Sequence, residues 1–315
     1  MNKSKHYIKS KHYITTLAVV VLVWAFTASS RAQRYSDWSA PINLGPTVNS
    51  ELNDFSPAIS KDGLSLYFTS ARLGGFGGDD IYVSQRDSGD DPWDPPVNLG
   101  PTINTSFADR DPAFSRDGHL MFFVTGRPGG SGGLDIWVSR RVHTNDDFAW
   151  QTPENLGAGV NSAARDDGPS YFANEEVGTP QLYFSSNRLG VFNAYVSEQA
   201  ADGSLGPAIL ILELGEAVGS SMSPSIRHDG LEIFVNSNRP GSFGNTQDLW
   251  VSTRETVFDA WSEPVNLGPT VNSTFGDLSP DISSDRETLF FFSTRPGSLG
   301  FADLYMSTRT KLSGK

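Results

Sequence analysis

The residues of this chain that are best suited to chemistry are arginines and carboxylates, and most of them recur. An Arg stands eight or nine residues before an Asp in four segments, with a glycine-containing stretch between them. A substrate needs one set of groups, whereas these pairs are repeated, so we predict structural ion pairs that clamp hairpins. The predicted pairs are Arg72 with Asp80, Arg127 with Asp135, Arg239 with Asp248, and Arg295 with Asp303.

A second carboxylate recurs three residues before a proline, at Asp54, Asp109, Asp166 and Asp277. Asp residues in such loops commonly cap turns by accepting hydrogen bonds from nearby backbone N–H groups. Calcium is the alternative, because it prefers clustered carboxylate oxygens, but no segment has the spacing of a defined calcium-binding loop. We therefore expect a structural role, with no metal site and no cofactor.

A ligand site is best sought where the repeat is broken. The second and third units add charges next to the repeated Asp, the fourth replaces its loop with Leu214–Ser221, and the fifth has Asp281 inside its first strand. We predict a ligand cleft bordered by units two to four, on the face that carries these loops and the glycine-rich turns. The candidate ligand-binding residues are Asp109, Arg110, Asp111, Arg165, Asp166, Asp167, Glu216 and Asp281.

The signs of catalysis are sparse. Among the five predicted innermost strands only the last carries an acid, Asp281, whereas glycoside hydrolysis uses two carboxylates. The histidines form no site; His143 and the neighbouring Asp146 and Asp147 read as a solvated loop. We predict a non-catalytic binding module with no catalytic residues, rather than an enzyme. The alternative is a carbohydrate-active enzyme with carboxylates from Asp109, Asp111, Asp166, Asp167 and Asp281.

The N-terminus reads as an export signal. Four Lys residues precede an apolar run at 14–28, and Ser30-Arg31-Ala32 provides small residues for cleavage, so residues 1–32 are predicted to be a signal peptide. The chain would then be periplasmic or secreted, with no membrane span after signal removal. Its remaining 19 Lys and Arg against 36 Asp and Glu exclude nucleic acid as a partner. The absence of cysteine excludes disulfides and thiol chemistry.

Residues 33–315 are organised as a repeat. Equivalent prolines at positions 57, 112, 169, 224 and 280 lie 55–57 residues apart, which defines five units of about 56 residues in a single domain. In the first unit we predict four strands, at Pro57–Ser60, Leu64–Ser70, Ile81–Gln85 and Pro96–Leu99. An Asp62-Gly63 hairpin turn and a glycine-rich turn at 74–78 separate the first three.

Five small sheets of this kind bury both faces only when they pack radially. The chain opens with a copy of a fourth strand at Pro41–Leu44 and ends after a third strand at Leu304–Ser307. The N-terminal segment can therefore complete the last sheet. We predict an all-β, five-bladed β-propeller of four-stranded antiparallel blades, with the ring closed by the N-terminal strand and a monomeric state.

One octapeptide links the units: NLGPTVNS at Asn43–Ser50 returns with small changes at 98–105, 155–162 and 266–273. It is interpreted as the joint between blades, with Val48 and its equivalents filling the gap between neighbouring sheets.

The repeat resembles the WD40-like propeller repeats of the TolB type. Three features carry the resemblance: Ser60-Lys61-Asp62-Gly63, a strand that ends in Ser70-Ala71-Arg72, and Asp80-Ile81-Tyr82, with counterparts in units two, four and five. The third unit departs, having Asn174-Glu175-Glu176-Val177 where the Asp-Gly turn is expected. The resemblance implies an exported propeller that binds a protein or glycan partner through its loops.

Overall fold

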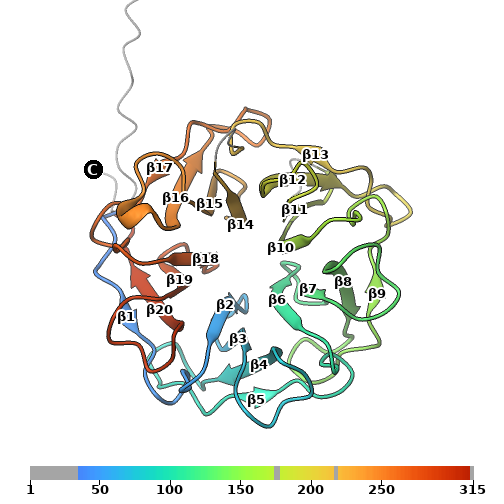
Figure 1. The fold of residues 1–315 in the computed structure, drawn as a ribbon, viewed down its shortest axis with the longest axis horizontal. Coiled ribbons are helices and arrows are strands. Elements are labelled where there is room, and N and C mark those ends of the chain that lie inside the picture. The colour runs from blue at the N-terminus through green and yellow to red at the C-terminus, as the bar shows by residue number, and fades with distance from the viewer. Residues whose placement is uncertain (1–34, 174–177, 216–218, 313–315) are drawn as a thin grey trace, which may run out of the picture.

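The computed structural model describes residues 35–173, 178–215 and 219–312, and they form a five-bladed β-propeller (Figure 1). The predicted signal peptide lies outside the described residues. Each blade is a four-stranded antiparallel sheet whose first strand lies nearest the axis. Within the described part of the chain, no helical segment has the length and apolar character that crossing a bilayer requires.

The strands of the five blades follow one pattern of three strands of six or seven residues and a two-residue outer strand. Blade 1 contains β2 (Asp54–Ile59), β3 (Ser65–Ser70), β4 (Asp80–Gln85) and β5 (Val97–Asn98); blade 2 contains β6 (Asp109–Phe114), β7 (Leu120–Thr125), β8 (Asp135–Arg140) and β9 (Glu154–Asn155); blade 3 contains β10 (Asp166–Phe172), β11 (Gln181–Ser186), β12 (Asn193–Glu198) and β13 (Ile209–Leu210); blade 4 contains β14 (Ser221–Ile226), β15 (Glu232–Ser237), β16 (Asp248–Thr253) and β17 (Val265–Asn266). Blade 5 contains β18 (Asp277–Ile282), β19 (Thr288–Ser293) and β20 (Asp303–Thr308).

The N-terminal strand β1 (Ile42–Asn43) completes blade 5 and closes the ring. Ile42 pairs with Met306 and Asn43 with Tyr305, so β1 takes the outer position next to β20. The predicted fold class and the predicted closure are both confirmed. The termini meet at this closure because strand β1 and strand β20 belong to the same sheet.

The second strand of a blade is buried on both faces. All six residues of β3 are buried, although their alternation of apolar and polar residues predicted a half-buried strand. Leu66 and Phe68 pack in the cluster shared with blade 5, while Tyr67 packs in the cluster shared with blade 2. Radial packing therefore gives each middle strand two buried faces, which alternation along one sheet does not indicate.

The octapeptide forms the joint between blades, as predicted. Val48, Ile103, Val160 and Val271 are fully buried, and Val48 contacts apolar residues of blades 5 and 1. The second Asn of each copy bonds the backbone of the preceding blade: Asn104 Oδ1 accepts from Ile81 N at 2.8 Å, and its Nδ2 donates to Ile81 O at 2.8 Å. Asn98 Nδ2 donates to Asp80 Oδ2 at 2.8 Å.

The predicted pairing of Arg72 with Asp80 and of its equivalents is wrong. Arg72 pairs with Asp54 at 2.8 Å, Arg127 with Asp109 at 2.8 Å, Arg188 with Asp166 at 2.6 Å and Arg295 with Asp277 at 2.5 Å. The carboxylate of Asp80 instead accepts hydrogen bonds from the N–H groups of Phe76 and Gly77, and so caps the glycine-rich turn.

Arg72 contacts the inner strand and the joint rather than the carboxylate at the other end of its own hairpin. Arg72 lies over the rings of Phe68 and Tyr82, and its Nη2 also donates to Val48 O at 2.7 Å, so it links the blade to the joint. The carboxylates equivalent to Asp80 in blades 2 and 5 follow the same rule as Asp80. Asp135 and Asp303 cap their own turns by accepting from Gly132 N and Gly300 N.

The remaining predicted pair, in blade 4, is also not formed as an ion pair with Asp248. Asp248 accepts from Phe243 N at 2.9 Å, within the short 3-10 turn Phe243–Asn245, and from Asn266 Nδ2 at 2.7 Å. Arg239 Nη2 donates to Leu214 O at 2.9 Å. Ser221 occupies the position that Asp54 holds in blade 1.

Candidate functional site

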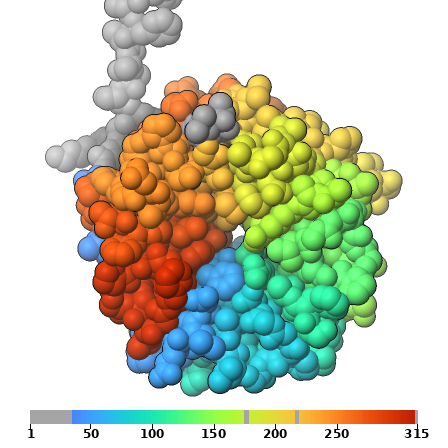
Figure 2. Space-filling model, viewed as in Figure 1, coloured from blue at the N-terminus to red at the C-terminus, as the bar shows by residue number. Residues whose placement is uncertain are grey.

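The candidate site is the axial channel, which the innermost strands of all five blades line (Figure 2 shows the blades meeting around a central hollow). Its volume is about 130 Å³, and it is lined from the residues before the five inner prolines to the turns that follow the inner strands. A broader depression of about 1070 Å³ shares lining residues with it at those turns. We call the face with these turns, between first and second strands, the lower face, and the opposite face the upper face.

A bulge shapes the upper end of the channel. In each inner strand the residue before the proline has positive φ, between 48° and 54°, and the pairing with the second strand shifts register there. These residues are Ser56, Asp111, Gly168, Ser223 and Ser279. A bulge re-aims side chains and is frequent beside functional sites.

Three of the bulge residues narrow the upper end. The hydroxyl of Ser279 is 3.4 Å from that of Ser56 and 3.3 Å from that of Ser223, which links blades 1, 5 and 4. A side chain at Gly168 would place its Cβ 2.8 Å from Ser223 Cα, so glycine is required at this close approach. The channel is therefore constricted above, and its wider mouth is on the lower face.

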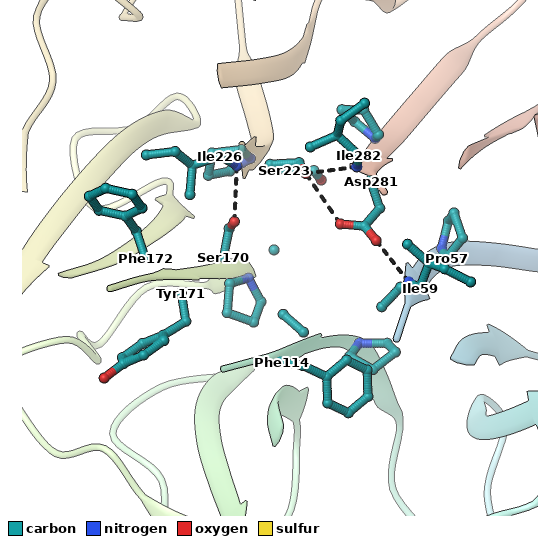
Figure 3. Close-up of a pocket in the computed structure, with 18 of the residues that line it drawn as sticks. Pro57, Ile59, Phe114, Ser170, Tyr171, Phe172, Ser223, Ile226, Asp281 and Ile282 are labelled. Atoms are coloured by element: carbon teal, nitrogen blue, oxygen red, sulfur yellow. Dashed lines mark hydrogen bonds between the residues drawn. The ribbon is translucent and has the colours of Figure 1, made fainter. Parts of the chain in front are cut away.

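Asp281 projects into the channel from β18 (Figure 3). Its Oδ2 accepts from Ile59 N at 2.8 Å, and its Oδ1 accepts from the Ser225 hydroxyl at 3.2 Å. Burial raises the pKa of this carboxyl to about 7, and the two hydrogen bonds oppose that shift. Asp281 is thus a carboxylic acid that exists in both protonated and ionised forms near neutral pH.

The residue at the Asp281 position in each blade links neighbouring blades where it is polar. Ser170 Oγ accepts from Ile226 N at 3.1 Å and Ser225 Oγ accepts from Ile282 N at 3.3 Å, in the same way that Asp281 accepts from Ile59 N. Asp281 therefore has a structural role at the closure between blades 5 and 1. Its difference from Ser170 and Ser225 is the ionisable proton that it brings into the channel.

Asp111 and Asp167 form a second acidic element. Asp111 lines the channel, whereas Asp167 is buried beside it, and Arg165 contacts Asp167 as an ion pair. Burial, followed by the negative charge of Asp111, raises the pKa of Asp167 to about 7 against the opposing effect of Arg165. Among the described residues neither oxygen of Asp167 accepts a well-directed hydrogen bond.

The structure separates the predicted ligand-binding residues into three groups. Asp109 and Asp166 are fully buried in the ion pairs of the joints, and Arg110 pairs with Asp79. Arg165 and Asp167 lie next to the channel, while Asp111 and Asp281 line it. Glu216 lies outside the described residues. The channel also involves all five blades, so the predicted cleft between units two and four on the upper face is not what the structure presents.

Some of the functional polar groups were not anticipated. Asp147 is buried rather than solvated: it accepts hydrogen bonds from Ser65, Tyr67, Gln85 and Arg141, which joins blades 1 and 2. At the lower mouth of the channel, Lys61, Arg116 and His228 line the wall. The signal for these three was a basic residue directly before Asp-Gly in units one, two and four.

The described residues contain no group of three or more metal-ligating His, Asp or Glu side chains. The acids that line the channel come from different blades: the carboxylate of Asp281 accepts from Ile59 N and the Ser225 hydroxyl, and the backbone N–H of Asp111 donates to the Thr69 hydroxyl. The arrangement places groups that can donate or accept a proton on the wall of a narrow channel, and acid–base chemistry requires such groups.

Comparison with known proteins finds the same propeller fold in solved structures. Neither a scan against family models nor a search of curated proteins finds a match. A thermostable family-43 glycoside hydrolase shares 16% identity at TM-score 0.57, covering 87% of this chain and 94% of that one. The α-L-arabinofuranosidase PaAbf62A from Podospora anserina, in complex with cellotriose, shares 12% at TM-score 0.59, covering 88% and 98%. An α-L-arabinofuranosidase from Lactobacillus brevis shares 14% at TM-score 0.59, covering 86% and 94%.

These comparisons correct the sequence-based predictions. The resemblance to TolB-type repeats is supported only in its propeller fold, because the solved structures named above are glycoside hydrolases. The predicted non-catalytic binding module, and with it the prediction that the chain is not an enzyme, is contradicted by the same comparisons. At 12–16% identity the likeness shows the fold, and the reaction rests on the residues of the channel.

Proposed function

We propose that this chain is a glycoside hydrolase that accepts a glycan in its axial channel. Asp281 is the general acid, and Asp111 is the second carboxylate. The observation that carries the proposal is Asp281: an acid on the channel wall whose pKa is raised to about 7 by burial. A general acid works best when its pKa lies near the working pH, because it then holds a proton and still gives it up readily.

The chemistry requires a proton donor and a proton acceptor on two sides of the bond. Asp281 gives its proton to the glycosidic oxygen as the bond from that oxygen to the anomeric carbon breaks. Asp111 takes a proton from the water that attacks the same carbon. Blades 5 and 2, which carry these residues, are not neighbours in the ring, so the two carboxyl groups approach the channel from different directions.

Asp167 supports Asp111 in this scheme. Two carboxylates that interact at close range do not ionise together readily, and here the pKa of Asp167 is the one raised to about 7. Asp167 is therefore the member of the pair that holds a proton near neutral pH, and Asp111 is the member that lines the channel. Asp167 touches no substrate in this scheme and is a positioning residue.

A glycan as the substrate class is supported by the ligands and activities of the structural neighbours, which include cellotriose and xylotriose complexes and arabinofuranosidases. The channel narrows toward the upper face, so the substrate enters from the lower face.

The test is a hydrolysis screen of the purified chain against aryl glycosides of pentoses and hexoses and against xylo-oligosaccharides. We expect hydrolysis of at least one member, with a loss of about 10²–10⁴-fold in kcat/KM for Asp281→Asn and Asp111→Asn. Asn keeps the size of Asp and can still accept the hydrogen bond from Ile59, so the fold should persist, which a thermal melt would verify. Asp90→Asn, an exposed acid in the loop after β4, is the matched control.

The proposal fails if the folded wild-type chain hydrolyses none of the panel. It also fails if Asp281→Asn and Asp111→Asn hydrolyse a substrate as fast as the control variant.

A further inference from the structure

The lower mouth of the channel is built from the turns between the first and second strands of the blades. In blades 1, 2 and 4 the residue before Asp-Gly in this turn is basic, namely Lys61, Arg116 and His228. All three line both the channel and the broader depression below it. The corresponding turn of blade 3 lies outside the described residues, and blade 5 has Ser284 there.

The acids of the same turns are engaged within the turns. Asp62 Oδ1 accepts from the Ser60 hydroxyl at 2.6 Å and from Leu64 N at 3.1 Å, and Asp117 Oδ1 accepts from the Ser115 hydroxyl at 2.6 Å and from His119 N at 3.1 Å. Asp229 is paired with Arg227 at 2.7 Å. Carboxylates used in this way fix the turn and are less available to balance a neighbouring cation.

The basic residues at the lower mouth differ in whether they are already paired and in whether they are charged. Lys61 and Arg116 are exposed, and neither forms an ion pair with any described residue. Arg286 is paired with Asp229 at 3.1 Å. Burial and the nearby charge of Arg286 lower the pKa of His228, so at neutral pH its imidazole offers a neutral hydrogen-bonding group.

Among the described residues that line the broader depression, the acids are Asp117, Asp229 and Glu255. Asp117 and Asp229 are held as described, and Glu255, in the loop after β16, is the remaining acid among the described residues that line the depression. The chain as a whole carries a formal charge of −12. Two cations that form no ion pair with the described residues are therefore a local departure from an acidic protein, and such a departure is expected at a site for an anion.

We propose that the glycan accepted by the channel is acidic, and that Lys61 and Arg116 bind a carboxylate or sulfate group on it at the lower mouth. This inference rests on the proposed function and adds the substrate class to it. Arg presents a planar fork that suits the oxygens of a carboxylate or sulfate, and Lys adds a point charge. His228 completes the contact as a neutral partner.

The distance along the channel between Asp281 and the basic residues indicates which sugar of the glycan carries the charged group. Ser284 is three positions after Asp281, which corresponds to at most roughly 10 Å of extended chain. The anion-binding residues are therefore nearer the lower face than the proposed general acid. The charged group lies on a sugar beyond the bond that is cleaved, toward the lower face.

The experiment measures binding by titration calorimetry with three probes: trigalacturonate, a sulfated trisaccharide and the neutral xylotriose. Binding is measured on Asp281→Asn so that hydrolysis does not interfere. We expect at least one of the acidic probes to bind about tenfold or more tightly than xylotriose, with an affinity that falls as salt rises. Lys61→Ala with Arg116→Ala should remove that preference and leave xylotriose binding unchanged, while Lys311→Ala, an exposed cation near the C-terminus, should change nothing.

The outcomes separate this inference from the proposed function. Acidic-probe binding that depends on Lys61 and Arg116, without hydrolysis of any glycoside, supports the inference as a binding site and overturns the enzyme. Hydrolysis without any preference for an acidic probe keeps the enzyme and overturns the inference. A preference that survives the double substitution also overturns it, because the charges would then be recognised elsewhere. The two acidic probes distinguish a carboxylate from a sulfate ester.

Discussion

The joint between blades 1 and 2 and the joint between blades 3 and 4 are the same turn of chain built from different residues. In the first, Asn98, Asn104 and Asp109 hold the blades together. In the second, Leu210, Gly215 and Ser221 occupy those three positions. The partner of Asn98, which is Asp80, is replaced there by Asn193.

We call the contacts that Asn98, Asn104 and Asp109 make in joint 1/2 the polar clasp, and the described residues of joint 3/4 do not reproduce it. What both joints keep is the apolar filler and the arginine on its carbonyl: Ile103 and Leu214 are fully buried, and Arg127 and Arg239 donate to their carbonyl oxygens. The backbone bond into the next inner strand also remains, with Ser221 N donating to Phe192 O at 2.9 Å. The apolar filler, the arginine bond and this backbone bond are therefore common to both joints, and the polar clasp adds stability to joint 1/2.

The largest effect is expected for the buried ion pair of the clasp. Asp109→Ala should lower the free energy of unfolding by about 3–5 kcal/mol, because it leaves Arg127 beside a buried site without its partner. Ser221→Ala, at the equivalent place in blade 4, should cost less than about 1 kcal/mol. Chemical denaturation of both variants provides the comparison. Equal losses would mean that the two joints are not different in the way described.

A smaller effect is expected for the amide of the clasp. Asn104→Ala should cost about 1–3 kcal/mol, because the buried N–H of Ile81 loses its acceptor and the C=O of Ile81 keeps only the N–H of Leu99 as a donor. Gly215→Ala is the counterpart and should be close to neutral, since the added Cβ would meet Asn193 Oδ1 at 3.1 Å, the end of a side chain that can shift. The same denaturation experiment measures both. A costly Gly215→Ala would indicate that joint 3/4 is packed as tightly as the others.

The smallest effect, counted per pH unit, is expected from two acids at the channel, because they make the free energy of unfolding depend on pH. Asp281 and Asp167 have folded-state pKa values raised to about 7, above the unfolded value of about 3.9, so the folded state binds more protons between these limits. Stability is then greatest below about pH 4 as far as these groups are concerned, and it falls as pH rises toward about 7. Each group contributes a slope of up to about 1.4 kcal/mol per pH unit.

Urea midpoints measured from about pH 4.5 to about pH 7.5 report this slope. Asp281→Asn should reduce it relative to the wild type, while Asp90→Asn should not. If the wild type and Asp281→Asn have the same slope, Asp281 does not carry a raised pKa.

Much of the fold follows from the sequence. The repeat of prolines and the octapeptide predicted five blades, the phase of the termini predicted closure by β1, and Val48 was correctly assigned to the gap between blades. These features are local or periodic, so spacing alone carries them. The inner strands begin three residues earlier than predicted, because the bulge before each proline extends the pairing to Asp54 and its equivalents.

The site follows from the sequence only in part. Asp111 and Asp281 were candidates, but the constriction at the upper end of the channel depends on Ser56, Ser223 and Ser279 of three blades, which no single segment indicates. Asp147 looked solvated because its partners Ser65 and Tyr67 are on another blade. The sequence predicted Asp80 as the partner of Arg72, but Asp80 caps the glycine-rich turn and Arg72 pairs with Asp54, which spacing within the hairpin does not indicate.

The role of Asp281 as the general acid is tested most directly by asking whether it protonates the leaving group. Once a hydrolysed glycan is identified, Asp281→Asn is assayed on that glycan and on the dinitrophenyl glycoside of the same sugar, whose leaving group departs without a proton. If Asp281 is the general acid, Asp281→Asn loses about 10²–10⁴-fold in kcat/KM on the glycan and little on the dinitrophenyl glycoside. An equal loss on both substrates, or none on either, would contradict Asp281 as the general acid.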